Sequence, residues 1–131
     1  MAYAEKTLVP VVDTIAEIRR VIVKHGGAQF VFGVGDDRVM VGFTKDSRQV
    51  RLQVGQDPKQ EQRNKASCRA LLLVTKAKLE AVAAGVSVFE DEFLAHIVLP
   101  DGKLVGSQAR VALAAAYEGR EMPPLLPDYS A

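Results

Sequence analysis

The sequence contains one cysteine, two histidines and no tryptophan, and these scarcities exclude several classes of protein. A single thiol, Cys68, cannot form an internal bridge, so a disulfide-stabilised secreted scaffold is excluded. Two histidines and one cysteine also leave too few ligands at matched spacing for a typical zinc site. We therefore expect a protein of the reducing cytoplasm that carries no metal and no cofactor.

Long apolar runs are also missing. No run reaches the roughly 18 residues that a membrane-crossing helix needs, and the first residues lack the basic-then-apolar pattern of a signal peptide. We expect no membrane partner. The composition, 48% hydrophobic and 25% charged, is ordinary for a globular protein, and 131 residues are most simply one domain, 1–131.

What the chain does contain is a run of helix-forming residues at 66–84, without proline or glycine, that stops at Gly85. At 100° per residue, Arg69, Lys76 and Glu80 share one narrow polar stripe, and apolar residues cover most of the rest. This pattern predicts a long central helix that is buried around most of its circumference. Lys78 lies in the apolar arc, and we expect it to extend its ammonium group into water.

The residues before this helix predict one further helix and three strands. Because Pro10 disfavours helix in the residue before it, 1–12 is predicted to be an extended lead-in. A helix then begins near Thr14, which has capping-box spacing to Glu17, and ends at 26–27. The strands are predicted at 29–34, 38–43 and 49–54, from their alternating apolar residues and the turn-forming residues between them.

A polar stretch without apolar residues, 55–65, is predicted to be a mobile surface loop leading into the central helix. After Gly85, the spacing of Ser87 and Glu90 predicts a capped short helix through Phe89 and Phe93. A turn at 100–102 predicts a small hairpin, which is followed by a last helix at 108–118. The proline-rich tail, 120–131, should be extended, with its two leucines packed on the domain.

The predicted fold is therefore α+β. An N-terminal helix precedes a three-stranded antiparallel meander, the long central helix covers the apolar face of that meander, and a small helix–hairpin–helix lobe follows. The alternative is a mostly helical protein in which only two strands pair.

Charge is unevenly distributed although the formal net charge is only +1. Residues 45–78 carry nine basic side chains against three acidic ones, whereas 79–131 carry three basic against eight acidic. A basic patch can neutralise phosphates, so the middle of the chain is a candidate nucleic-acid interface. Its candidate residues are Arg48, Arg51, Lys59, Arg63, Lys65, Arg69 and Lys76. The simpler alternative is an ordinary solvated surface.

Two other groups of residues invite a catalytic interpretation. The acidic residues 90–92 are followed by His96 at helical spacing from Glu92, but a metal site needs a further ligand, and a helix N-terminus explains the same acids. Cys68 lies on an apolar helix without a glycine-rich oxyanion frame, so a small buried side chain is the simpler interpretation. We therefore expect no enzymatic activity.

Four segments carry a resemblance to a known family: MAYAEKTLVPV at 1–11, RALLLVTKAKLEAV at 69–82, FEDEFLAHIVLPDG at 89–102 and MPPLLP at 122–127. Together they resemble a family of small uncharacterised proteins encoded by bacteriophages and prophages. The family is richer in tryptophan near the start of the central helix and after the LPDG turn, so this chain resembles a divergent member. The resemblance implies a setting inside a bacterial host, where such small proteins serve DNA metabolism or counter host defences.

Two functional hypotheses remain open from the sequence. In the first, a phage-type accessory protein binds DNA or RNA through the basic middle segment. In the second, the chain binds a host or phage protein, for example as an inhibitor of a defence complex. The acidic residues Glu90, Asp91 and Glu92 would then imitate nucleic acid. The sequence does not define the oligomeric state.

Overall fold

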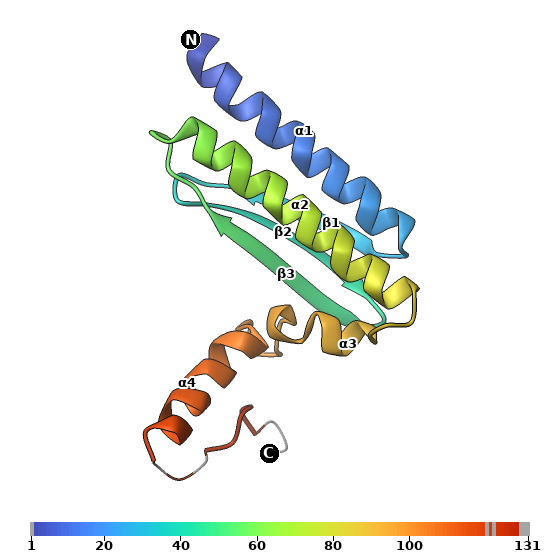
Figure 1. The fold of residues 1–131 in the computed structure, drawn as a ribbon, viewed down its shortest axis with the longest axis vertical. Helices are drawn as coiled ribbons and strands as arrows, with labels where there is room; N and C mark the ends of the chain where they lie inside the picture. Colours follow the sequence, from blue (N-terminus) through green and yellow to red (C-terminus); the bar gives the residue numbers. More distant parts are fainter. Residues whose placement is uncertain (1, 120, 122, 129–131) are drawn as a thin grey trace.

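The structure, a computed structural model, describes residues 2–119, 121 and 123–128. Its elements are α1 (Ala2–Lys24), β1 (Ala28–Val34), β2 (Arg38–Lys45), β3 (Arg48–Gly55), α2 (Glu61–Ala83), α3 (Phe89–Glu92), the 3-10 helix η1 (Leu94–His96) and α4 (Val105–Tyr117). The predicted α+β class is confirmed, with an N-terminal helix, a meander and a long helix in that order (Figure 1).

The three strands form one antiparallel sheet in the order β1-β2-β3. The hairpin between β2 and β3 closes through Asp46 and Ser47, which have φ angles of 50° and 62°. Positive φ at both central residues is the type I′ turn, whose twist suits a two-residue hairpin. Its register places Val41 opposite Leu52 and Phe43 opposite Val50, so the apolar residues of both strands lie on one face.

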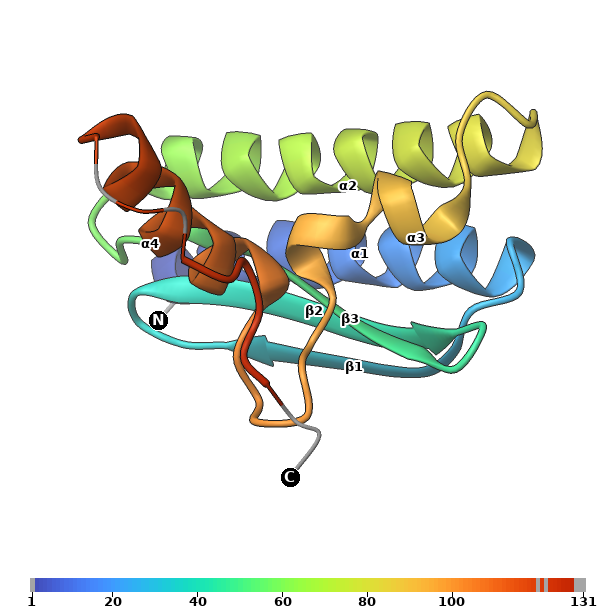
Figure 2. The same cartoon turned by 90° about the horizontal axis from the view of Figure 1, so that it is seen from below.

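Both long helices cover that apolar face. Figure 2 shows α1 and α2 on the same side of the sheet, which leaves the opposite face open. The core between the layers includes Ile18 and Ile22 from α1, Leu72 and Leu79 from α2, and Phe43 from the sheet. The open face of the sheet is the surface that carries the candidate site.

The predicted extended lead-in at 1–12 is wrong, because α1 already begins at Ala2; Met1 lies outside the described residues. Thr14 is consequently inside the helix and does not cap it. The reason is tertiary packing. Val11 and Ile15 are buried against Val39 and Cys68, so the apolar stripe of α1 starts before the predicted helix does and favours helix upstream of Thr14.

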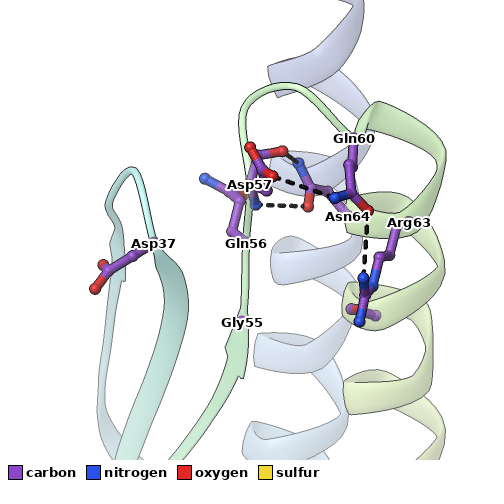
Figure 3. Close-up of a pocket in the computed structure, with 8 residues that line it drawn as sticks. Asp37, Gly55, Gln56, Asp57, Gln60, Arg63 and Asn64 are labelled. Carbon is purple, nitrogen blue, oxygen red and sulfur yellow. Dashed lines mark hydrogen bonds between the residues drawn. The ribbon is translucent and has the colours of Figure 1, made fainter.

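The predicted loop at 55–65 is shorter than expected, because α2 begins at Glu61. Asn64, which is buried, explains where the loop stops. Its Nδ2 donates to the carbonyl oxygen of Asp57 at 2.6 Å, and its Oδ1 accepts from the Asp57 N–H at 3.0 Å (Figure 3). These two hydrogen bonds hold the segment 56–60 against the first turn of the helix.

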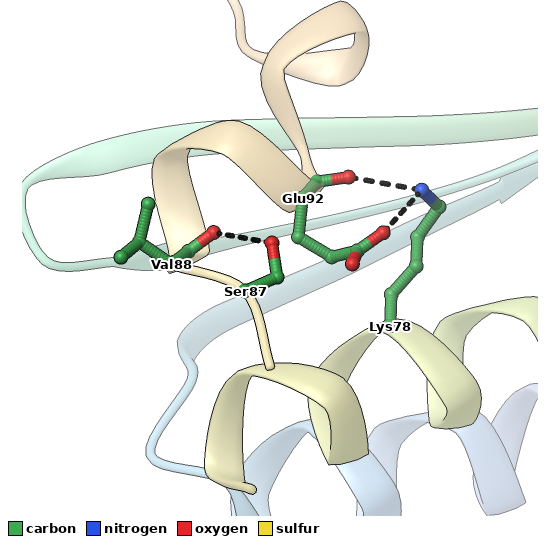
Figure 4. Close-up of polar contacts among 4 residues, drawn as sticks. All are labelled: Lys78, Ser87, Val88 and Glu92. Atoms are coloured by element: carbon green, nitrogen blue, oxygen red, sulfur yellow. Dashed lines mark hydrogen bonds and ion pairs between the residues drawn. The ribbon is translucent and has the colours of Figure 1, made fainter. Parts of the chain in front are cut away.

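The prediction that the central helix is buried around most of its circumference is wrong. Leu73 and Val74 of α2 are 56% and 46% exposed, because α1 and the sheet cover only one side of the helix. Lys78 also differs from expectation: its Nζ donates to the backbone oxygen and the carboxylate of Glu92 instead of extending into water (Figure 4).

The C-terminal lobe is anchored by aromatic residues. The ring of Phe93 meets that of Phe43 edge to face, with centroids 5.7 Å apart, and Phe89 packs on both rings. The predicted cap at Ser87 is wrong, since Val88 precedes α3 and no side chain caps it. The helix at this position is short, and a single 3-10 turn, η1, follows it.

The predicted small hairpin is present as one isolated antiparallel bridge, between Val98 and Leu104. A second bridge, between Ile97 and Val50, joins this hairpin to β3. The last helix, α4, begins three residues earlier than predicted and ends at Tyr117, two residues before Gly119, whose φ is 80°. Within the predicted tail, residues 120, 122 and 129–131 lie outside the described part of the chain. Leu125 and Leu126 line a hollow beside α4 but stay nearly half exposed.

Candidate nucleic-acid interface

The seven basic residues predicted as one interface are distributed over different parts of the structure, and three of them pair with carboxylates. The pairs are Arg48 with Glu90 at 2.8 Å, Lys65 with Glu61 at 3.4 Å, and Arg69 with Glu17 at 3.4 Å. An ion pair neutralises much of the field that a side chain presents to a phosphate. These three residues are therefore weak candidates for phosphate binding.

Two more of the seven lie near the beginning of α2. Lys59 is in the loop, and Arg63 lines a hollow of about 320 Å³ at the end of β3 (Figure 3). Asp37 and Asp57 line the same hollow, so its charge is mixed, and Arg63 donates to Gln60 at 3.3 Å. Lys76 is exposed on α2, on the opposite side of the molecule from the open sheet face.

The remaining residue, Arg51, lies on the open sheet face beside two basic residues that sequence reasoning missed. A hollow of about 380 Å³ is lined by Arg51 of β3, Arg38 of β2 and Lys103 of the hairpin loop. We call this hollow the basic groove; its other lining residues are Met40, Gln53, Gly102, Leu104 and Ser107. Of the described residues that line it, three carry a positive charge and none is acidic.

The backbone explains why Lys103 comes so close to the sheet. The bridge between Ile97 and Val50 attaches the hairpin to the outer edge of β3, and Val98 N–H donates to the Gln49 carbonyl at 2.8 Å. Figure 2 shows the loop between these bridges and α4 extending past the sheet, on the side away from α1 and α2. Nothing in the local sequence pairs Lys103 with Arg38, so only the tertiary contact could reveal the groove.

Arg51 connects the sheet to the hairpin loop at the groove. Its Nη2 donates to the carbonyl oxygen of Gly102 at 3.1 Å, which fixes the guanidinium beside the loop. A guanidinium has five N–H donors, so one such bond leaves others available to a ligand. Arg38 and Lys103 are exposed, whereas Arg51 is half-buried. The carboxylate of Asp101, the nearest acid in sequence, accepts the Lys103 backbone N–H at 2.9 Å.

A second hollow continues from the basic groove along the sheet, and Arg51 is the one charged residue among the described residues that line it. It has a volume of about 270 Å³ and shares Met40 and Arg51 with the groove. Gly42 forms part of its floor, since a side chain there would meet Val31 at 3.1 Å and the Val50 carbonyl at 3.2 Å. Gln29 and Thr44, joined by a 3.0 Å hydrogen bond, add polar groups to the lining. The open face thus has one end lined by three cations and another end where uncharged polar groups lie beyond Arg51.

The phenylalanines are not part of this face. Phe43 is fully buried on the helix side, and Phe30 packs against the same core. Phe32 differs from these two residues, because 52% of it is exposed. It lies opposite Val41 in β2 and therefore belongs to the helix side of the sheet. Among the described residues, the open face therefore carries no aromatic side chain on which bases could stack.

The acidic cluster 90–92 is largely used within the fold. Glu90 binds Arg48, and Glu92 binds Lys78, while Asp91 is exposed. Burial, and then the nearby charge of Lys78, lower the pKa of His96 from its ordinary value. Among residues 2–119, 121 and 123–128, no three His, Cys, Asp or Glu side chains are grouped so that they could hold a metal ion.

Cys68 is buried between the helices, where its Sγ lies 3.9 Å from the Val11 carbonyl oxygen. Burial raises the pKa of this thiol, which disfavours the thiolate that a nucleophile requires. The interpretation as a small core residue is consistent with this environment. In the described part of the chain, no helix has the length and hydropathy that would let it cross a membrane.

Comparison with known proteins adds no relative: no family model, no curated protein and no solved structure matches this chain.

Proposed function

We propose that this chain is a non-enzymatic, phage-type accessory protein that binds nucleic acid in the cytoplasm of a bacterial host. The contact surface is the open sheet face, with the phosphates held in the basic groove. The observation that carries the proposal is the convergence of Arg38, Arg51 and Lys103 on one groove without an acidic lining residue. The resemblance to phage-encoded proteins supplies the setting.

The chemistry of the groove fits a phosphate backbone. Arg38 and Arg51 project from neighbouring antiparallel strands, and Lys103 approaches from the hairpin, so three cations surround one site. The second hollow, beyond Met40, presents amide and hydroxyl groups to a nucleotide bound next to the phosphate. Without aromatic stacking, binding depends mainly on charge, and a single strand can follow the flat face more closely than a duplex.

The test is fluorescence anisotropy with labelled single- and double-stranded oligonucleotides of DNA and RNA. Three phosphate contacts predict a slope of log K against log salt of about −2 for a single strand. The variant Arg38→Ala/Lys103→Ala leaves the Arg51–Gly102 bond intact and removes two of the three cations. We expect it to weaken binding at least about tenfold and to make the salt slope shallower by about 1.4 units, the equivalent of two phosphate contacts.

A matched control comes from the other basic residues. Arg63→Ala/Lys65→Ala/Arg69→Ala removes three positive charges at the start of α2, away from the groove. The open-face proposal predicts a change of less than about threefold, through long-range charge alone. A tenfold loss in this variant would instead favour the interface first predicted from the sequence. Failure of the wild type to bind any of the oligonucleotides near 50 mM salt, where such contacts are strongest, would refute both.

The protein-binding hypothesis remains the alternative. It relies on Glu90, Asp91 and Glu92 as an imitation of nucleic acid, and two of these carboxylates already bind Arg48 and Lys78. A surface that imitates phosphates needs free carboxylates, so the acidic cluster supports this hypothesis less well than the groove supports nucleic acid. Neutralising Asp91 and Glu90 should leave oligonucleotide binding unchanged or slightly stronger, because repulsion is reduced.

A further inference from the structure

Strand β1 is the unprotected edge of the sheet. At the opposite edge, the segment at Ile97 and Val98 bonds to β3, whereas none of the described segments pairs with the outer side of β1. Its sequence, AQFVFGV, has no charge and no proline, which are the usual means of keeping such edges apart. Val31 and Phe32 are 53% and 52% exposed. A bulge near Gln29 shields only the beginning of the strand.

The hydrogen-bond pattern shows which groups of β1 are free. Gly35 N–H donates to the Arg38 carbonyl, so this pair is a hydrogen-bonded pair of the β1–β2 ladder. Such pairs alternate in antiparallel sheets, and therefore Gly33 and Val31 also turn their backbone groups toward β2. Phe32 and Val34 turn their N–H and C=O groups to the open edge.

A second exposed surface, apolar except for Arg19, lies beside this edge on α1. Val12, Ala16, Arg19 and Val23 are exposed and follow one another at spacings of four, three and four residues, as in a helix–helix seam. Glu17 pairs with Arg69 of α2 and marks the opposite flank of α1. The four residues therefore face away from α2, along the flank that no other described element covers (Figure 1).

We propose that a second copy of this chain binds here, through β1 and α1, as a two-fold dimer with a continuous six-stranded sheet. With Phe32 on the two-fold axis, Phe32 of each copy exchanges both backbone hydrogen bonds with its equivalent. Val31 then faces Gly33 of the second copy, a large residue against a small one, and the two Phe32 rings cover each other on the helix side.

The same two-fold axis also brings the α1 helices of the two copies together. The helix α1 returns into β1 through a tight turn in which Gly27 N–H donates to the Ile22 carbonyl at 2.9 Å. From His25, the midpoint between Ala16 and Arg19 is about 11 Å along the helix, and Phe32 is about 13 Å along the strand from Ala28. The midpoint of the helix seam and Phe32 therefore lie at similar distances from the turn that joins α1 to β1. One two-fold axis can then pair the strands at Phe32 and bring Val12 of α1 against Val23 of the second copy.

This coincidence favours a second copy over an unrelated peptide. An extended peptide would satisfy the edge of β1 but would leave Val12 and Val23 uncovered. A two-fold copy covers both surfaces with one operation, and the absence of charge in β1 means that no like charges meet at the strand pair. Interfaces of this kind are isologous and close at the dimer.

The experiment is multi-angle light scattering behind size-exclusion chromatography, at a loading of about 100 µM so that micromolar dimers stay associated. We expect the wild type at twice 14.2 kDa. Phe32→Glu places two carboxylates at the axis and should give a monomer, as should Val12→Glu/Val23→Glu. Phe32→Leu keeps an apolar side chain and the free N–H, and should remain dimeric.

The matched control is Val86→Glu, the same type of change at a residue that is 82% exposed in the loop after α2. It should leave the dimer intact. Circular dichroism must show that the monomeric variants keep the wild-type helix and strand content. A monomeric wild type would overturn the proposal and leave β1 to a peptide of another protein. A dimer that survives both Phe32→Glu and Val12→Glu/Val23→Glu would overturn it by placing the contact elsewhere.

Discussion

Lys78 of α2 and Glu92 of α3 form a half-buried ion pair, with Nζ 3.1 Å from the carboxylate and 2.9 Å from the backbone oxygen of Glu92 (Figure 4). The ammonium also lies 5.7 Å from the centre of the Phe93 ring. One side chain thus connects the central helix to the segment that carries the hairpin and, through it, the basic groove.

Replacing Lys78 by methionine should therefore destabilise the protein. Methionine preserves the apolar stem but removes the donor, so the Glu92 carboxylate stays half-buried without its cation. We expect a loss of about 1–2 kcal/mol in the free energy of unfolding, measured by urea denaturation. The control, Arg48→Met, breaks the exposed pair with Glu90 and should cost less than about 0.5 kcal/mol. Equal losses in the two variants would contradict this explanation.

Acid should destabilise the fold through His96. Because burial and Lys78 lower its pKa in the folded state, the unfolded chain binds this proton at higher pH than the folded protein does. The contribution of His96 is complete above its ordinary pKa of about 6.5 and decreases as the pH falls below that value. Urea denaturation at several pH values should show a smaller decrease for His96→Gln than for the wild type. If the free energy of unfolding of the two proteins changed in parallel with pH, His96 would not be the group responsible.

The close approach of α4 to η1 depends on Gly106. A Cβ at this position would lie 2.9 Å from the Ala95 carbonyl oxygen and 3.1 Å from the Ala95 Cβ. Alanine normally stabilises a helix relative to glycine, yet here we expect Gly106→Ala to cost about 1–3 kcal/mol, because backbone must move. Gly55→Ala, where nothing lies within 4 Å, is the control. A stabilised Gly106→Ala variant in thermal denaturation would show that the contact is looser than described.

The turn between β2 and β3 should be improved by glycine. Ser47 has a φ of 62°, a conformation that costs a residue with a side chain about 1 kcal/mol. Ser47→Gly creates the Asp-Gly pair that type I′ turns prefer, and we expect it to raise the unfolding free energy by up to about 1 kcal/mol. Ser67→Gly, inside α2, should lower it by a similar amount. Destabilisation by Ser47→Gly would disagree with the turn geometry.

The sequence by itself determined the sheet and its connections. Val39, Val41 and Phe43 alternate with Arg38, Met40 and Gly42, and Val50, Leu52 and Val54 alternate with polar residues. Strand positions and inward faces therefore followed from a period of two. Turn residues fixed where the strands end. These features depend on neighbours in sequence, and for this reason the α+β class and the order of elements were predictable.

Helix limits were less predictable because long-range contacts decide them. Asn64 starts α2 early by binding Asp57, and the packing of Val11 against Cys68 belongs to a helix that begins before Thr14. The intrinsic helix preference of a few residues contributes less free energy than such burial does. A prediction from local sequence therefore placed both helix starts too late.

The candidate site was decided by the tertiary structure alone. The basic residues of the middle segment can be counted in the sequence, but only the fold shows that Glu90, Glu61 and Glu17 neutralise three of them. Nor does the sequence place Lys103 beside Arg38, because a bridge between Ile97 and Val50 brings the hairpin to the sheet. Charge is a property of the sequence, whereas the field at a surface depends on distances that only the folded chain defines.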